Sequence, residues 1–560
     1  MQFKQSLLRL LLLLLPFSAF SQNTYLPQGD KSVQLLDRME IISRGDSLLN
    51  FSKTRPFNRK QAVQGALRFA AMHRSKISPI DQYNLNRLLL NNLEYLPDSA
   101  RRVFNSKKPF LTSFFTSPAN LYEVHVKDFD LVINPVLQFS LSKEKNNSDN
   151  LFQNTRGLTL RGRIANKIGF YTYLTENQEK TAGYVRELVT SRLAVPGAGF
   201  YKGFKGTGYD YFDARGGITF NATRYIDVAF GYDRNFIGNG HRSLFLSDFG
   251  NSNLFLKLNT RIWKFNYQNL FMELHNADNR IGDRLIGKKY AAMHHLDVAV
   301  TKWLNIGLFE GVIFGRQNRF DFGYLNPIIF YRSVEQQNGS FDNSVAGLDV
   351  KANLPHKIQL YGQLMLDEFL LSEIKNNRGW WANKWGLQLG AKYIDAFGIP
   401  NLDLQAEHNR VRPFTYSHRD SVANYTHYNQ PLAHPLGANF SEWIAIARYQ
   451  PAARWNLTGK LIAYTQGRDS SSRSYGSNIF YPNVPPFRTG DFGYENGSGW
   501  KTAVFYASLA ASYEVKENLY IDLSAVVRKL DTKTSPLISN NTSVISLGVR
   551  WNMFRKEFDF

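Results

Sequence analysis

Residues 358–367, Ile-Gln-Leu-Tyr-Gly-Gln-Leu-Met-Leu-Asp, alternate between apolar and mostly polar side chains. Successive side chains of a β-strand point to opposite faces, so this segment has one apolar face and one wetter face. The same period of two recurs in residues 387–393, 402–407, 521–528 and 543–553. Strands of soluble proteins average about 5–6 residues, whereas these segments extend toward about 9–11 residues, the length with which a tilted strand crosses a bilayer.

The composition excludes several classes of protein. The 560 residues include 42 Phe, 29 Tyr, 9 Trp and 40 Gly but no Cys, which excludes disulfides, cysteine-ligated metal sites, a cysteine nucleophile and a lipid-modified N-terminal cysteine. With 20% charged and 43% hydrophobic residues, the chain is not largely disordered. Beyond the N-terminus, no apolar run approaches the about 18–20 residues of a membrane-spanning helix.

The first 21 residues have the pattern of a secretory signal peptide. Lys4 and Arg9 precede the apolar run Leu10–Leu15, and the small residues of Ser18–Ser21 offer a cleavage site before Gln22. A signal anchor is the alternative, but the apolar run is too short to span a bilayer. We therefore expect residues 1–21 to be removed and the mature chain to be exported.

Residues 22–117 are predicted to form a small helical domain, placed in the periplasm. Apolar residues recur at helical spacing from Val33 to Ile42 and from Ala62 to Ala70, behind a candidate Asn58 cap. Ser78-Pro79 supplies a cap and a proline at the first helical position. Residues 30–117 contain 15 Lys and Arg against 7 Asp and Glu. This basic excess indicates either a solvated face or contact with anionic lipid or an acidic polymer.

Residues 118–560 are predicted to form an all-β transmembrane barrel. About 440 residues, at roughly 24 per strand with its connection, give about 18 antiparallel strands. Polar connections at Lys143–Asn150, Asp469–Asn478 and Pro482–Gly499 are expected to be external loops. The alternating segment Ser543–Met553 and the terminal Phe560 are similar to the signal by which bacterial outer-membrane barrels reach their assembly machinery. A lumen of this size needs water or a plug.

One charged residue breaks the alternation of the barrel strands. Glu310 falls on the apolar face of a segment that includes Leu304, Leu308, Val312 and Phe314. The sequence predicts either a bulge at this point or a part of the strand that lies above the membrane.

Catalytic and metal-binding signatures are absent from the sequence. The glycines of residues 203–208 lack phosphate-loop spacing, and neither His-Glu-x-x-His nor Gly-x-Ser-x-Gly occurs. Neighbours on a strand point to opposite faces, which argues against Asp367-Glu368 as a glycosidase pair and against His294-His295 as metal ligands. The scattered His418, Asp420, His427 and His434 are interpreted as loop residues. We expect no catalysis, cofactor or metal.

Charged residues of the predicted lumen face are the first candidate ligand-binding group. They are Arg161, Arg163, Lys392, Asp403, Glu407 and Arg448. These residues form either a charge ladder that compensates itself inside a wet barrel or a track for an acidic glycan, with aromatic residues as sugar platforms. The net charge of +21 is spread along the whole chain, so we do not expect nucleic acid to bind.

Residues 231–248, Gly-Tyr-Asp-Arg-Asn-Phe-Ile-Gly-Asn-Gly-His-Arg-Ser-Leu-Phe-Leu-Ser-Asp, resemble the Wzi capsule-assembly family. More closely, the chain resembles the RemB-like outer-membrane proteins of the Bacteroidetes that are associated with gliding motility. Residues 322–327, 334–339, 366–369 and 427–437 support the resemblance, which covers most of residues 120–560. It implies an 18-stranded barrel with a periplasmic helical bundle and a lectin-like role in holding or assembling surface polysaccharide.

Four residues of that segment, Asp233, Arg234, His241 and Arg242, are the second candidate group. The glycines between them permit positive φ angles, so the segment could be a strand–turn–strand corner whose ions pair across the lumen. The alternative is that the four side chains contact a ligand.

The sequence thus predicts an outer-membrane barrel of a Gram-negative bacterium that binds, anchors or organises surface polysaccharide. Its expected partners are that polysaccharide, outer-membrane lipid and the barrel-assembly machinery. A diffusion porin or transport channel has the same architecture with an open lumen and remains an alternative. An envelope enzyme acting on glycans or lipids is a second alternative.

Overall fold

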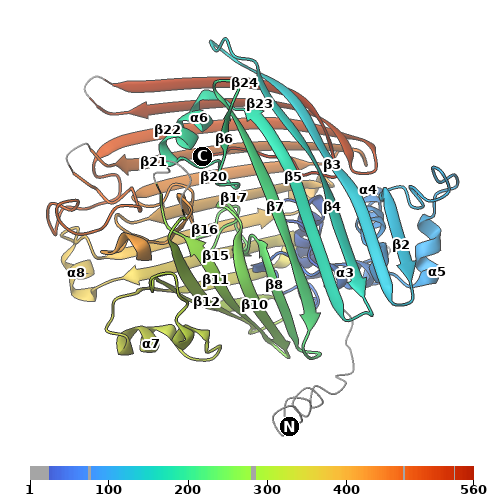
Figure 1. Ribbon diagram of the computed structural model, residues 1–560, viewed down its shortest axis with the longest axis horizontal. Coiled ribbons are helices and arrows are strands. Elements are labelled where there is room, and N and C mark those ends of the chain that lie inside the picture. Colours follow the sequence, from blue (N-terminus) through green and yellow to red (C-terminus); the bar gives the residue numbers. More distant parts are fainter. Residues whose placement is uncertain (1–23, 74–76, 279–284, 471–472, 535–536) are drawn as a thin grey trace, which may run out of the picture.

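The computed structural model describes residues 24–73, 77–278, 285–470, 473–534 and 537–560. The predicted signal peptide, residues 1–21, lies outside these residues. The rest forms a closed, antiparallel barrel of 18 strands with a group of helices from the N-terminal part of the chain, as the sequence predicts (Figure 1). The barrel strands are β3 (Phe129–Glu144), β4 (Leu151–Ile164), β5 (Ile168–Lys180), β7 (Gly208–Asn221), β8 (Ile226–Asp233), β10 (Asn253–Ile262), β11 (Phe265–His275), β12 (Lys288–Ala299), β13 (Leu304–Phe314), β14 (Asn343–Leu354), β15 (Ile358–Glu368), β16 (Lys384–Tyr393), β17 (Leu402–Val411), β20 (Phe440–Tyr449), β21 (Trp455–Arg468), β22 (Trp500–Lys516), β23 (Leu519–Thr532) and β24 (Ile538–Trp551).

Closure comes from pairing between the last and first long strands. Residues 544–551 of β24 pair with residues 137–144 of β3, so the sheet has no free edge along this seam. The short strand β2 (Tyr122–Val126) pairs with the beginning of β3 and extends the wall beside the seam. Strand β6 (Lys202–Phe204) pairs in the same way with the beginning of β7.

The two ends of the barrel differ in the length of their connections. At one end, called here the near end, successive strands are joined by short turns such as residues 263–264 and 517–518. At the other end, called the far end, the connections include the long segments 181–207, 315–342 and 469–499. The last of these contains two of the loops predicted from the sequence, Asp469–Asn478 and Pro482–Gly499. The far-end segments carry α6 (Gly183–Arg192), η3 (Phe322–Leu325), α7 (Tyr331–Gln337) and α8 (Leu371–Asn376).

Side chains alternate between the outside and the inside of the wall, as the sequence predicts. On β23 and β24 the paired residues Leu523 and Leu547 point outward and are 53% and 58% exposed. On β15 the outward Leu360 is exposed, whereas its neighbour Tyr361 is buried in the lumen. The barrel therefore presents an apolar exterior, the surface that a transmembrane barrel offers to lipid. Among the described residues, no helix has the length and apolar character needed to span a membrane.

The N-terminal helices pack around an apolar core of their own. They are α2 (Lys31–Ser43), α3 (Arg59–Met72), α4 (Pro79–Leu90), η1 (Leu93–Tyr95), α5 (Asp98–Arg101) and η2 (Arg102–Phe104). Asn58 and Ser78 accept hydrogen bonds from the backbone of Gln61 and Asp81, which confirms both predicted caps. The core contains Leu36, Met39, Ala62, Val63, Ala66, Phe69, Leu85, Leu88 and Leu93.

The helical domain lies against the near end. Asn91 exchanges side-chain hydrogen bonds with Asn518 in the turn between β22 and β23. Asn84 makes the same exchange with Gln450 in the turn between β20 and β21. Figure 1 shows these helices on the side opposite α7 and α8. The short turns of the barrel are thus the surface on which the domain docks.

Two far-end loops fold into the lumen. Residues 234–252 and 412–439 meet the inward side chains of β10 to β17 in one apolar core, which includes Leu244, Phe245, Tyr416 and Tyr425. Loop 234–252 also reaches the helical domain, where its strand β9 (Phe236–Ile237) pairs with β1 (Thr54–Arg55). The predicted strand–turn–strand corner is therefore wrong, because the segment is a long inward loop. Its contacts with the N-terminal domain and with the wall of the lumen hold it there.

The C-terminus also turns into the barrel. Strand β24 ends at Trp551, and the remaining residues place Phe560 in a buried cluster with Tyr184 of α6 and with Phe249. The Tyr184 hydroxyl donates a hydrogen bond to the Phe558 carbonyl at 2.6 Å. Phe560 is therefore not part of the last strand, in contrast to its place in the assembly-signal pattern.

Of the two features predicted at Glu310, the bulge is wrong, whereas a place above the membrane stays a prediction. Strand β13 pairs with β12 and β14 without a register shift, so it has no bulge at this point. The Glu310 carboxylate accepts hydrogen bonds from the backbone amides of Tyr331 and Arg332, both at 2.9 Å, at the beginning of α7. A negative charge here stabilises a helix N-terminus that lies against the outside of the barrel.

Candidate functional site

Charged residues inside the near end bind the helical domain. Arg161 of β4 contacts Glu94 at 2.8 Å and donates to the Asn91 carbonyl at 2.7 Å. Lys392 of β16 contacts Asp37 at 2.7 Å. The contacts are more specific than the predicted charge ladder, because both partners come from the N-terminal domain rather than from neighbouring strands.

Arg38 of α2 is the centre of a second set of contacts between domain and barrel. Its guanidinium lies 3.1 Å from Asp81 and 3.0 Å from Asp395 and also pairs with Asp403 of β17. All four side chains are at most 15% exposed. We call Arg38, Asp81, Asp395 and Asp403 the near-end clamp.

The other predicted lumen residues pair within the barrel wall. Arg163 pairs with Asp130 of β3, and its guanidinium lies 5.0 Å from the centre of the Tyr95 ring. Arg448 donates to Gln405 at 3.2 Å. Both groups are occupied by partners from this chain.

Asp233 and Arg234 stand where β8 passes into the inward loop. Asp233 accepts a hydrogen bond from the Tyr171 hydroxyl at 3.1 Å. Arg234 donates to the Asp248 carbonyl at 3.1 Å and lies 3.8 Å from Asp213. The two side chains therefore fix both ends of the loop instead of meeting one another.

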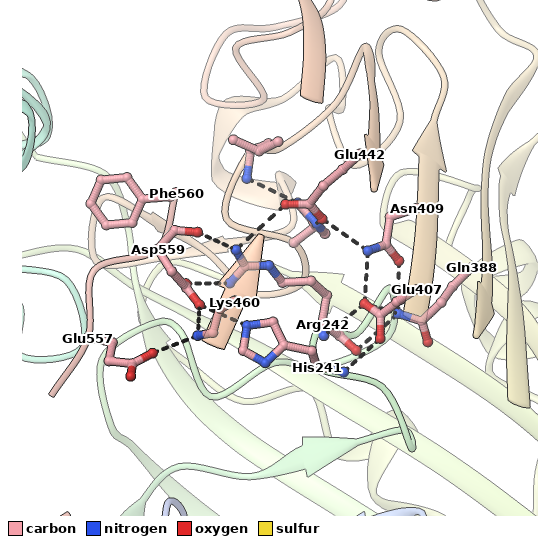
Figure 2. Close-up of polar contacts among 12 residues, drawn as sticks. His241, Arg242, Gln388, Glu407, Asn409, Glu442, Lys460, Glu557, Asp559 and Phe560 are labelled. Carbon is pink, nitrogen blue, oxygen red and sulfur yellow. Dashed lines mark hydrogen bonds and ion pairs between the residues drawn. The ribbon is translucent and has the colours of Figure 1, made fainter. Parts of the chain in front are cut away.

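His241 and Arg242, farther along the same loop, bind the C-terminal tail (Figure 2). Arg242 contacts the Asp559 carboxylate at 2.9 Å and donates to the Asp559 carbonyl at 2.6 Å. The Nε2 atom of His241 lies 2.8 Å from the same carboxylate, which also pairs with Lys460 of β21. We call His241, Arg242, Lys460 and Asp559 the C-terminal latch.

Glu407 of β17 holds the backbone of the latch in place. It accepts hydrogen bonds from the amides of His241 and Arg242, at 2.7 and 3.1 Å, and from the Tyr361 hydroxyl at 2.8 Å. A Cβ atom on Gly240 would lie 2.5 Å from this carboxylate, so the close approach requires glycine at that position.

Burial and charge change the acidity of the latch groups. The pKa of His241 is lowered to about 4, first by burial and then by the neighbouring Lys460 cation. Burial alone would raise the pKa of Asp559, but Arg242 and Lys460 hold it well below its usual range. At neutral pH the latch is thus a carboxylate paired with two cations and bonded to a neutral imidazole.

A small cavity lies between the tail, α6 and the wall formed by β22–β24, β3 and β4. Its volume is about 130 Å³, and residues 555–558 of the tail form one side. The wall side is rich in hydroxyl groups, from Ser140, Ser142, Ser508, Ser524 and Ser546. Since small side chains line this wall, space remains there that larger residues would fill.

Aromatic and basic side chains gather on the far-end loops 369–383 and 469–499. Arg378 lies 4.3 Å from the centre of the Phe492 ring, and Arg488 lies 4.2 Å from that of Trp381. Tyr481 and Phe487 stack with ring centres 5.3 Å apart, and both are at least 40% exposed. We call these six residues the far-end cluster. Their positions in loops gave no periodic signal, so the sequence analysis missed them.

No group of three or more His, Cys, Asp or Glu suited to a metal ion occurs in the described part of the chain. His294 and His295 do point to opposite faces: His295 binds Asp349 in the lumen, while His294 stacks against Tyr331 outside. For Asp367 and Glu368, however, the prediction that neighbouring side chains on a strand point to opposite faces is wrong. A register shift in β15 lets both carboxylates approach Lys384, at 3.7 and 3.3 Å.

Comparisons with known proteins support the barrel assignment. The family model described as capsule assembly protein Wzi matches residues 263–524. No curated protein matches the chain. The solved structure of Wzi, an Escherichia coli outer-membrane protein involved in group 1 capsule assembly and described as a carbohydrate-binding β-barrel, is 13% identical. That match covers 96% of this chain and 100% of Wzi with a TM-score of 0.56.

Another solved structure, OprD of Pseudomonas aeruginosa, is 12% identical over 75% of this chain and 94% of OprD, with a TM-score of 0.39. The chain is therefore similar to Wzi in fold over nearly its whole length and in sequence pattern over much of its barrel.

Proposed function

We propose that this protein is an outer-membrane barrel that binds and organises surface polysaccharide during capsule assembly, in a lectin-like manner without catalysis. The observation that carries the proposal is the far-end cluster on a barrel whose lumen is occupied by its own chain. The Wzi family match and the shared fold support it, because Wzi is described as a carbohydrate-binding barrel of capsule assembly.

The filled lumen favours binding over diffusion. Loops 234–252 and 412–439 build an apolar core inside the wall, and the helical domain covers the near end. A porin of this strand number leaves an aqueous channel. The long loops of the far end are therefore the surface at which a large ligand acts.

The far-end cluster has the chemistry of an acidic sugar platform. Aromatic rings such as Tyr481 and Phe487 offer flat apolar faces for the C–H side of a sugar ring. Arg378 and Arg488 carry planar donors suited to carboxylate or phosphate groups. They pair with Glu373 and Asp491 in this structure, so anionic groups of the polymer would take the place of these carboxylates. The predicted site residues Arg161, Arg163, Asp233, Arg234, His241, Arg242, Lys392 and Arg448 are bound to partners from this chain through the contacts described above, and the proposed platform does not include them.

Binding of extracted surface polysaccharide to purified protein in detergent tests this proposal. The double variant Tyr481→Ala/Phe487→Ala is expected to weaken binding roughly tenfold, equivalent to about 1.4 kcal/mol. Trp263→Ala is the matched control, because Trp263 is 79% exposed but lies in a near-end turn. Equal affinities of the double variant and the wild type would contradict the proposed site.

Salt dependence tests the charge of the polymer. If arginines of the far-end cluster bind anionic groups, affinity should fall as the ionic strength rises through about 0.1 M, where the screening length is about 10 Å. Titration in increasing NaCl measures this. Salt-independent binding would indicate a neutral polymer held by stacking and hydrogen bonds.

We further propose that residues 1–21 are a cleaved signal peptide and that the near end faces the periplasm, since periplasmic connections of such barrels are short. Protease added to intact cells should then spare the exposed Arg102 region, and permeabilised cells should lose this protection.

A role in surface motility follows from the resemblance to RemB-like proteins and is part of this proposal. Deletion of the gene, with retained polysaccharide and cell spreading scored together, separates a capsule role from a motility role.

A further inference from the structure

The far-end connection between β13 and β14 folds back over the outside of the barrel. In this outer-wall segment, residues 315–342, Tyr324 and Tyr331 are fully buried against outward side chains of β11 to β13. The Tyr267 hydroxyl of β11 donates to the Pro327 carbonyl at 2.6 Å. Figure 1 shows α7 of this segment outside the barrel wall. The segment thus forms a second layer on part of the exterior.

The wall beneath this layer carries a row of polar residues. Asn269, His294 and Glu310 are paired across β11, β12 and β13 and point outward. The His294 ring centre lies 3.8 Å from that of Tyr331. The Glu310 carboxylate accepts hydrogen bonds from the first two backbone amides of α7. Polar and charged groups on a lipid-facing wall are unfavourable. The outer-wall segment covers this row.

The exposed side of the same segment carries large apolar side chains beside polar residues such as Asn326 and Arg332. Phe322, Ile328 and Phe330 are 78%, 82% and 79% exposed, and Leu325 beside them is also exposed. A loop in water places polar groups on such a face, and a cluster of large apolar side chains marks a surface that is covered by a partner. Large apolar side chains therefore point both toward the wall and away from it.

The exposed side is continuous with the outward face of the barrel. Leu308 of β13 and Leu348 of β14 are directly paired, point outward and are 54% and 39% exposed. Helix α7 and the turn η3 provide hydrogen-bond partners for many backbone groups of the segment. The Asp321 side chain also accepts a hydrogen bond from the Gly323 amide. Such internal bonding is required of any backbone that contacts hydrocarbon.

We infer that the outer-wall segment is a lipid-binding surface, in which Phe322, Ile328 and Phe330 contact the acyl chains of the membrane and replace the polar row beneath as the lipid-facing layer. The inference rests on the membrane placement proposed above and is independent of polysaccharide binding.

Spin labels test this inference, and the absence of native cysteine makes each labelled position unique. The variants Ile328→Cys and Phe330→Cys are spin-labelled in the full chain, and the protein is reconstituted in phosphatidylcholine–phosphatidylglycerol vesicles. Collision with oxygen, which partitions into lipid, is compared with collision with a water-soluble nickel chelate. Leu308→Cys is the lipid control, and Tyr481→Cys in the far-end cluster is the aqueous control.

The expected result is that labels at 328 and 330 collide more with oxygen than with nickel, as the label at 308 does. If they behave like the label at 481 while 308 reports lipid, the inference is wrong but the membrane placement holds. If 308 also reports water, the membrane placement itself fails. Strong dipolar coupling between labels at 328 would show that a second copy covers the segment, which also overturns the inference.

Discussion

At the scale of single residues, several cations inside this barrel are bound to carboxylates of the same chain. Arg242 and Lys460 share Asp559, and Arg38 is surrounded by Asp81 and Asp395 among others. Each cation is buried, and a buried charge is tolerated when it is paired and hydrogen-bonded. A ligand inside the lumen would have to displace these buried partners, whereas Arg378 of the far-end cluster pairs with Glu373 at the surface, where its side chain is 53% exposed.

Asp559→Ala removes the carboxylate of the C-terminal latch. Because Arg242 and Lys460 would remain buried without their partner, the free energy of unfolding should fall by about 3–5 kcal/mol. Denaturant unfolding in detergent micelles measures the change. Asp531→Ala is the control, since Asp531 pairs with Lys529 at 3.2 Å on the surface and such pairs contribute about 0–1 kcal/mol. Similar losses in the two variants would contradict the assigned role.

Acid should also weaken the latch. The pKa of His241 is about 4 in the folded protein against 6.5 for the free side chain, so the unfolded chain binds more protons between these values. Stability from this group is complete above about pH 6.5 and is lost as the pH falls toward about 4. Asp559, whose pKa is lowered, adds a loss at still lower pH. His241→Gln should flatten the dependence between pH 6.5 and 4 in unfolding measurements.

At the scale of elements, three segments distant in sequence meet inside the barrel. The helical domain provides β1, the inward loop provides β9 and the tail provides Asp559. The contacts that hold them differ in kind. A two-residue ladder joins β1 to β9, and an apolar core joins the inward loop to the wall. Ion pairs join the tail to Arg242 of the loop and to Lys460 of the wall. The material that fills the lumen therefore comes from three separate segments, and a substitution can weaken the contacts of one segment without removing those of the others.

Arg38→Ala tests the near-end clamp. The substitution leaves Asp81, Asp395 and Asp403 close together without their common cation, so the helical domain should detach more readily from the turns. Cleavage of purified protein by trypsin at the exposed Arg102 should become several-fold faster. Arg68→Ala is the control, because Arg68 is 47% exposed and its contacts, with Asp46 at 3.5 Å and with the Ser47 hydroxyl at 3.4 Å, stay within the helical domain. An unchanged cleavage rate would show that other contacts hold the domain.

At the scale of the whole molecule, the filled lumen limits the passage of ions and solutes through the barrel. The wild-type protein should show little steady conductance in planar bilayers. Truncation after Trp551 removes the tail and exposes the serine-lined cavity, so small steady currents should appear. Large steady currents from the wild type would favour the porin alternative instead. The surface variant Asp531→Ala should behave as the wild type does.

The sequence by itself determined the wall of this protein. Alternation in segments such as 358–367 and 521–528 predicted the strands of a barrel, because the period of two follows directly from strand geometry. The number of residues available per strand gave the strand number of about 18. The helix caps Asn58 and Ser78 were also predictable, because each cap bonds a backbone amide only a few residues away in the sequence. The polar connections at the far end were also recognisable from local composition.

Only the tertiary structure decided what lies inside and around that wall. The partners of Arg242, Lys392 and Glu310 are 317, 355 and about 20 residues away along the chain, and no local period encodes such distances. The inward course of residues 234–252 depends on a strand pairing with the N-terminal domain, and the far-end cluster depends on two loops packing together. Strand geometry is local, whereas charge pairing and loop packing depend on the closed barrel that brings distant segments together.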